Sequence, residues 1–124
     1  MNINKFEEII RNIPVFSNLP EEHLTLLHKQ FEKKSFHNQS IIFSEKDPGQ
    51  DMFIIISGAV EIFQEHNNKK KVLAVLKDGD FFGEISVLTS IARTASVMAV
   101  TDVEILVLNK QNLIELLKKI INFH

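Results

Sequence analysis

The 124-residue sequence contains no cysteine, tryptophan or tyrosine, and it carries no excess of positive charge. Without cysteine the chain has no disulfide scaffold, no thiol nucleophile and no thiolate ligands for zinc or iron–sulfur centres. Its 14 basic and 16 acidic side chains leave a formal net charge of −2. A nucleic-acid-binding protein usually has a clear positive excess, because phosphate contacts supply most of its affinity. We therefore expect no direct nucleic-acid binding by this chain.

Long apolar runs are missing as well. The most apolar stretch, residues 53–56, is far shorter than the ~20 residues that a membrane-spanning helix needs. The first five residues lack the charged-then-apolar layout of a secretory signal. The length fits one domain, which at this size buries roughly two-thirds of the surface that the unfolded chain exposes. These features predict a soluble, cytoplasmic module, a single domain over residues 1–124, without membrane contact.

The two ends of the chain have helical periodicity. Residues 3–34 carry apolar side chains every three to four positions, interrupted at Pro14, and a second helix is expected to start near Pro20. At the other end, Asn109 suits the N-cap of a terminal helix over residues 109–124. The expected buried positions are Leu24, Leu27, His28 and Phe31 in the second helix and Leu113, Leu117, Ile120 and Ile121 in the last one.

The middle of the chain, residues 36–108, has the pattern of short strands separated by turns. Asp78-Gly79 is a turn sequence, and Asn67-Asn68 followed by three lysines at 69–71 indicates a solvated hairpin tip. Many short strands at close spacing are typical of a β-sandwich or barrel. The expected strands are residues 40–43, 52–57, 59–64, 72–76, 95–99 and 103–108.

One segment between the expected strands, residues 81–97, carries groups suited to a phosphate and a sugar. Gly83 permits backbone angles or a close approach that a side chain would forbid. The Arg93 guanidinium is planar and permanently charged, which suits a phosphate diester, whereas the Glu84 carboxylate only accepts hydrogen bonds, which suits a sugar hydroxyl. A helical turn at residues 85–88 would point free amide hydrogens at an anion. Together these groups indicate a nucleotide site.

The same residues resemble a known motif. Phe82-Gly83-Glu84-Ile85, the nine steps from Glu84 to Arg93, and the following Thr94-Ala95-Ser96-Val97 are similar to the phosphate-binding cassette of the cyclic-nucleotide-binding domain family. That family includes the catabolite activator protein, the regulatory subunit of protein kinase A and cyclic-nucleotide-gated channels. Residues 13–19 and 47–58 also resemble the start of its N-terminal helices and its first barrel hairpin.

The resemblance implies an α+β, mainly β fold. It is a double-stranded β-helix, or jelly-roll barrel, flanked by N-terminal helices (residues 1–35) and a C-terminal helix (109–124), with the barrel over 36–108 and the cassette over 82–97. In the family a further C-terminal helix closes over the base. The sequence stops soon after Ile121, so we expect this lid to be absent or very short.

The resemblance also implies the role of each site residue. Glu84 accepts a hydrogen bond from the ribose 2′-hydroxyl and Arg93 pairs with the cyclic phosphate, while Ile62 and Leu73 match positions that touch the base. Thr94 matches a position whose hydroxyl meets the guanine amino group in several cGMP readers, but threonine is also a good strand residue, and it does not settle the base. The candidate ligand-binding residues are Phe82, Gly83, Glu84, Ile85, Ser86, Arg93, Thr94, Ala95, Ile62 and Leu73.

Three functions remain open at this point. The first is a ligand-sensing regulatory module that binds cAMP, slightly favoured, or cGMP, with an attached or separate effector domain as its partner and no cofactor, metal or catalytic residue. The second is a nucleotide-blind interaction module on the same fold, with Arg93 as a surface ion-pair partner and Glu84 as a solvated turn residue. The third, a cupin-type enzyme, needs converging histidines, and the expected strands between residues 59 and 108 contain none.

Overall fold

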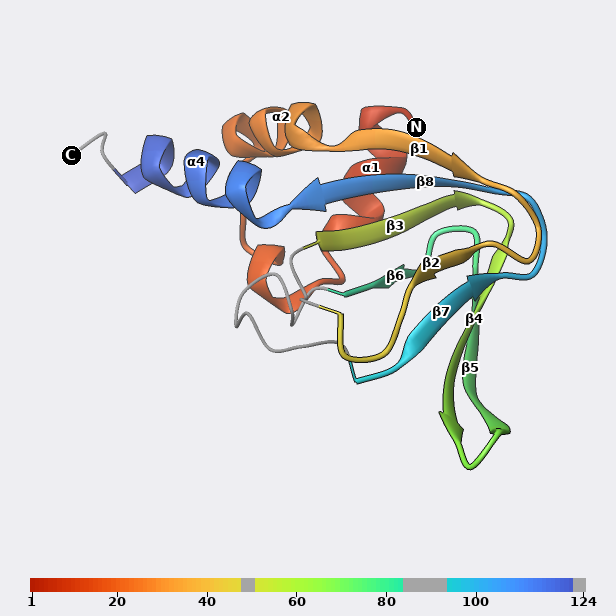
Figure 1. Ribbon diagram of the computed structural model, residues 1–124. Helices are drawn as coiled ribbons and strands as arrows, with labels where there is room; N and C mark the ends of the chain where they lie inside the picture. The colour runs from red at the N-terminus through yellow and green to blue at the C-terminus, as the bar shows by residue number, and fades with distance from the viewer. Residues whose placement is uncertain (48–50, 84–93, 122–124) are drawn as a thin grey trace.

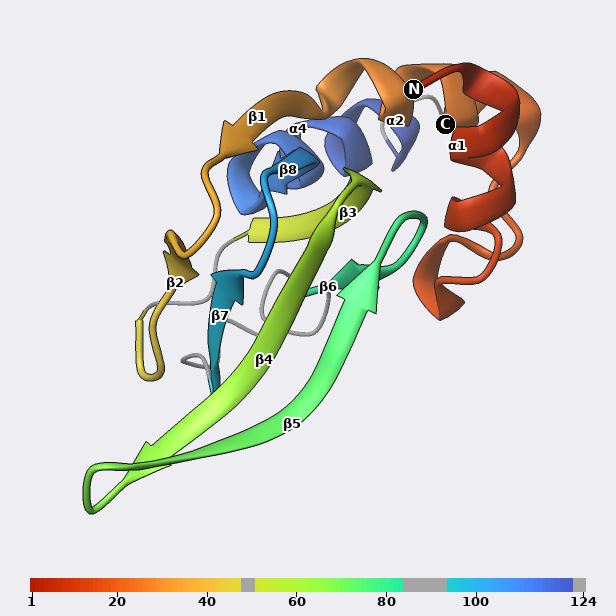
Figure 2. The ribbon, with the colours of Figure 1, turned by 90° about the vertical axis from the view of Figure 1, so that its right-hand side faces the viewer.

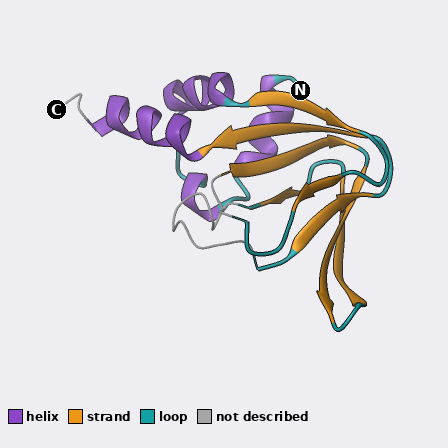
Figure 3. Cartoon of the chain, viewed as in Figure 1, coloured by secondary structure: helices purple, strands orange, loops and turns teal. Residues whose placement is uncertain are grey.

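The computed structural model describes residues 1–47, 51–83 and 94–121, and it has helices at both ends and strands between them (Figures 1 and 3). The helices are α1 (Ile3–Ile10), the short 3₁₀ helix η1 (Pro14–Phe16), α2 (Glu21–Gln30) and α4 (Lys110–Ile121). The strands are β1 (Glu32–Phe36), β2 (Ile41–Phe43), β3 (Asp51–Ser57), β4 (Ala59–His66), β5 (Lys69–Lys77), β6 (Phe81–Phe82), β7 (Ser96–Ala99) and β8 (Val103–Asn109).

The strands form two antiparallel four-stranded sheets, with the orders β1-β8-β3-β6 and β2-β7-β4-β5. This confirms the mainly β fold class with flanking helices. Among the described residues no strand pairing joins the two sheets, so hydrogen bonds do not close them into a barrel. Within the same residues, none of the helices combines the length and the apolar character needed to cross a membrane.

Gly58 turns the chain from the first sheet into the second, between β3 and β4. Its φ of +101° lies in the left-handed region, and a Cβ there would lie 2.5 Å from the carbonyl oxygen of Asp102. The Gly58 amide donates a hydrogen bond of 2.8 Å to the Asp78 carboxylate. Only glycine fits this corner without displacing the backbone beside it.

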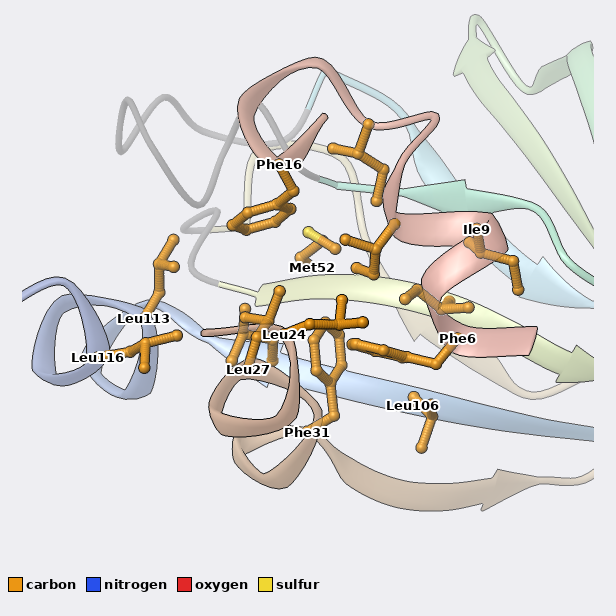
Figure 4. Packing of buried hydrophobic residues seen from close by; sticks show 14 residues of the cluster. Phe6, Ile9, Phe16, Leu24, Leu27, Phe31, Met52, Leu106, Leu113 and Leu116 are labelled. Atoms are coloured by element: carbon orange, nitrogen blue, oxygen red, sulfur yellow. The ribbon is translucent and has the colours of Figure 1, made fainter. Parts of the chain in front are cut away.

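The helices pack on the face of the first sheet that points away from the second sheet. The buried side chains of the helices form one cluster with residues of β3 and β8 (Figure 4). In α1 the buried residues are Phe6, Ile9 and Ile10, as the periodicity predicts. In α2, Leu24 and Leu27 are buried, and Phe31, directly after the helix, is buried too. His28 is partly buried, and its ring lies 4.5 Å from that of Phe6, measured between centroids.

The second cluster lies between the two sheets. It includes Phe53 and Ile55 of β3, Phe82 of β6, Val60 of β4, and Val97 of β7. Together with the helical cluster it buries the first sheet on both faces. Each large apolar side chain buried in this way contributes about 1.5–3 kcal/mol to folding.

Several expected boundaries were wrong. The predicted helical region, residues 3–34, extends too far. Glu32–Phe36 form the edge strand β1, which pairs with β8. Lys69–Lys71 belong to strand β5 and not to the hairpin tip, which consists of Asn67 and Asn68. Both asparagines have positive φ, +53° and +63°, as a two-residue type I′ turn requires.

The terminal helix begins as predicted but faces the core differently. The Asn109 side chain accepts a hydrogen bond of 2.8 Å from the Asn112 amide, which confirms it as the N-cap. The Asn112 side chain donates to the Gln30 carbonyl oxygen at the end of α2. Leu113 and Leu116 are buried in the core, whereas Leu117, expected to be buried, is 39% exposed. The side chains of Ile120 and Ile121 lie outside the described residues.

The adjacent leucines of α2 provide a test of this packing. Leu27 is fully buried, whereas Leu26 is 37% exposed. We expect Leu27→Ala to lower the free energy of unfolding by about 2–5 kcal/mol, because it leaves a cavity in the helical cluster. The control Leu26→Ala should lower it by less than about 1 kcal/mol. Urea denaturation followed by circular dichroism measures both, and equal losses would contradict the burial of only one of them.

Candidate functional site

The segment predicted to bind the ligand is described only at its two ends. Glu84, Ile85, Ser86 and Arg93 lie outside the described residues. Phe82 and Gly83 precede this stretch, Thr94 and Ala95 follow it, and Ile62 and Leu73 lie on β4 and β5. These six residues form the frame of the candidate site.

Two consecutive phenylalanines anchor the first end of the frame. Phe82 pairs with Phe53 and Phe81 with Ile54, so β6 is a short edge strand beside β3. The Phe82 ring is buried and stacks on Phe53 with a centroid distance of 4.8 Å and an interplanar angle of 12°. The Phe81 side chain packs instead against the helical cluster. Because neighbouring residues of a strand point to opposite faces, β6 is fixed in both clusters at once.

Gly83 follows this anchor directly. Its φ of +85° lies in the left-handed region, which glycine adopts without the steric cost that a Cβ imposes. The Phe82 ring is buried in the cluster between the sheets. Its part in the frame is therefore to fix the position at which the segment starts.

The second end of the frame is held by polar contacts. The Thr94 carbonyl oxygen accepts a hydrogen bond of 2.8 Å from Gln64 Nε2 of β4. Two residues later, Ser96 Oγ accepts one of 2.8 Å from the Glu45 amide. The Thr94 side chain is exposed and lies in a bend before β7. Its alternative interpretation as a strand residue is therefore wrong.

Ile62 lies on the inner face of the second sheet. It pairs with Val97 of β7 and packs on the cluster between the sheets. Ala95 lies in the bend directly before β7 and is buried. Leu73 lies at an irregularity in the β4–β5 pairing, where Ile62 pairs with Ala74 and Phe63 with Val72. Its side chain is about half exposed.

Two of the contacts that hold the frame in place were not predicted from the sequence. The stack of Phe53 and Phe82, with the Phe43 ring 5.6 Å from that of Phe53, forms only when distant strands meet. Gln64, by contrast, follows Ile62 by two positions in an expected strand, and this spacing would have placed both on one face. In the described ranges no group of three or more histidine, aspartate or glutamate side chains is arranged to hold a metal ion.

The two antiparallel sheets and the flanking helices place the chain among the jelly-roll domains. The sequence also identifies the family within this class. Residues 33–120 match the cyclic nucleotide-binding domain, and the chain belongs to this family.

Relatives of known name agree with this assignment. The chain is 31% identical over 112 residues to the cyclic AMP receptor protein of Thermus thermophilus, covering 90% of this chain and 52% of that protein. It is 31% identical over 105 residues to a cAMP-dependent protein kinase regulatory subunit of Hypocrea atroviridis, covering 85% of this chain and 22% of that protein. The chain thus spans about half or less of the curated relatives that it matches.

A solved structure supports the same fold. The structure of cAMP-bound PfPKA-R, residues 141–441, superposes with a TM-score of 0.84 at 30% sequence identity. The match covers 92% of this chain and 41% of that one. The chain therefore spans less than half of the solved chain in this comparison.

The left-handed backbone at Gly83 gives a prediction for stability. We expect Gly83→Ala to cost about 1–2 kcal/mol, because a Cβ is strained at this φ. Gly83→Asn should recover part of the loss, since asparagine tolerates the left-handed region better than alanine. Thermal unfolding of the three proteins measures the order. If alanine matched glycine in melting temperature, residue 83 would not hold this conformation in solution.

Proposed function

We propose that this chain is a ligand-sensing regulatory module that binds a 3′,5′-cyclic nucleotide, with cAMP slightly favoured over cGMP. The observation that carries the proposal is the family match over residues 33–120, which includes the whole cassette. The relatives are named as a cyclic AMP receptor protein and a cAMP-dependent kinase regulatory subunit. The proposal accordingly assigns binding and regulation to residues 1–124 as a single domain, without a catalytic step.

In this proposal Arg93 and Glu84 recognise the two polar parts of the ligand. The Arg93 guanidinium donates to the cyclic phosphate, and the Glu84 carboxylate accepts from the ribose 2′-hydroxyl. Backbone amides near Gly83, Ile85, Ser86 and Ala95 complete the anion site. Each hydrogen bond to a charged group contributes about 1.5–3 kcal/mol. The frame supports this arrangement, because β6 and β7 fix both ends of the segment that carries the two charged residues.

The base would lie beside the second sheet. In this proposal the base contacts Ile62 on the inner face, Leu73 on β5 and the exposed Thr94. Ile62 and Leu73 offer apolar contact to either purine. The Thr94 hydroxyl is the only one of these groups that would distinguish guanine from adenine, through the guanine amino group.

The signal would pass from the cassette to the terminal helix. Phe81, which begins the strand before the cassette, packs on the same cluster as Leu113 and Leu116 of α4. A phosphate that draws Arg93 inward would move this cluster and α4 with it. A ligand shifts such an equilibrium only by its difference in affinity between the two arrangements. An attached or separate effector domain would respond to the position of α4.

The two arginines of the chain provide a matched test of the phosphate contact. We expect Arg93→Ala to weaken cAMP binding by about 10- to 100-fold, because it removes a charge-assisted contact. Arg11→Ala should leave the affinity unchanged, since Arg11 pairs with Glu7 and donates to the Leu19 carbonyl oxygen in the N-terminal region. Titration calorimetry with cAMP and cGMP measures both. The absence of heat from the wild-type protein at tens of micromolar nucleotide would refute the proposal.

The role of Thr94 can be tested separately. Thr94→Val keeps the shape of the side chain and removes its hydroxyl. If this hydroxyl meets the guanine amino group, cGMP binding should weaken by about fivefold, the loss of one neutral hydrogen bond. The affinity for cAMP should not change. If the affinities for both nucleotides fell equally in the same titrations, Thr94 would not select the base.

A further inference from the structure

Strand β5 is the edge of the second sheet. Among the described residues it pairs only with β4. Figure 2 shows the β4–β5 hairpin extending away from the helices, with β5 along its outer side. An edge strand presents backbone N–H and C=O groups that a further strand can pair with.

The centre of this edge is apolar and exposed. Val72 is 49% exposed, Leu73 47% and Val75 59%. Three of the most exposed large apolar side chains among the described residues therefore lie within four positions of one strand. Protective lysines in the centre of an edge would discourage pairing. Here the lysines lie at the two ends, at 69–71 and 77.

The two valines share the outer face of the sheet. Lys70 pairs with the Glu61 carboxylate and lies over the Phe63 ring, 4.7 Å from its centroid, which places these three residues on one face. Val75 is the register partner of Glu61 and Val72 that of Phe63. Directly paired residues of an antiparallel ladder point to the same side. The valines therefore face away from the cluster between the sheets.

The edge carries positive charge only. All four charged residues of β5 are lysines, although the whole chain has a net charge of −2. Lys70 is neutralised by Glu61, whereas Lys69, Lys71 and Lys77 take part in none of the ion pairs found among the described residues. An added strand would meet these lysines at both ends of its apolar centre.

These charges oppose pairing with a second copy of the chain. Because directly paired residues share a face, an antiparallel pair of β5 strands that covers the outer valines would place Val72 of one copy opposite Val75 of the other. The same register places Lys70 of each copy opposite Lys77 of the other. Like charges directly opposite one another destabilise a ladder. The register that would cover the two valines is therefore penalised.

A lipid surface fits this edge poorly too. Proteins that lie on membranes insert large side chains such as tryptophan, phenylalanine and leucine at the interface. The exposed centre of β5 consists mainly of valines, and the chain has no tryptophan or tyrosine. Exposed valines and a strand edge instead favour pairing with a further strand.

We propose that β5 receives an extended segment of a partner protein, which adds to the sheet as a fifth strand. The segment carries an apolar centre opposite Val72 and Val75 and acidic side chains opposite Lys71 and Lys77. Main-chain hydrogen bonds provide affinity, and the flanking carboxylates select the segment and its register. This interaction uses the outer face and the edge of the hairpin.

The test uses two short blocked peptides with the same alternating valine–threonine centre. One has glutamates at both ends and the other has lysines. We expect the glutamate peptide to bind at least about tenfold more tightly in fluorescence polarisation, because several cross-strand charge pairs change sign together. The double variant Lys71→Glu with Lys77→Glu should reverse the order. The control Lys29→Glu with Lys118→Glu makes the same charge change on α2 and α4 and should keep the wild-type order.

Hydrogen exchange on the wild-type protein distinguishes strand addition from general charge attraction. The glutamate peptide should protect amides of β5 and leave β1, an edge strand of the first sheet, unchanged. Equal affinity for both peptides, or no protection in β5, would overturn the proposal. Self-association in sedimentation equilibrium that Val75→Lys abolishes would overturn it in favour of a second copy. Binding to phosphatidylserine vesicles without peptide binding would overturn it in favour of a membrane.

Discussion

The burial of β3 and β8 on both faces is the constraint on which the rest of the structure depends. In β3, Met52 and Ile54 point into the helical cluster, while Phe53 and Ile55 point between the sheets. Strand β8 divides in the same way, with its even-numbered leucines toward the helices and Ile105 toward the second sheet. Two central strands thus join three layers into one core, and neither the helices nor the second sheet would be positioned without them.

The strand that leads into the candidate site also packs against both clusters. Phe81 and Phe82 continue the alternation of β3 at the edge of the first sheet, one side chain in each cluster. The segment proposed to hold the phosphate therefore starts from a point that is mechanically connected both to the helices and to the inner face of the second sheet. A binding segment attached to only one layer would have no such connection to α4.

The sequence predicted those parts of the molecule whose pattern is local. The buried strands have apolar runs, the N-cap Asn109 has its own chemistry, and the cassette pattern led to the family that the match over residues 33–120 confirmed. Strand β1 was missed because Glu32–Phe36 is a charged edge strand, held in place by β8 and not by its own periodicity. Leu117 was misplaced because the face of α4 that is buried depends on packing against α1, α2 and the first sheet, where Leu113 and Leu116 lie. The frame of the site, in the same way, depends on aromatic and amide contacts between distant strands.

The junction at Asn109 has a mechanical consequence. This residue is the last of β8 and also the N-cap of α4, so strand and helix meet without a linker. The 12 residues of α4 form a rod of about 18 Å at 1.5 Å per residue. A rotation of only about ten degrees at the junction would move the far end of this rod by about 3 Å, since displacement grows with helix length. With no loop to absorb it, any rotation at this junction would be passed directly to the helix.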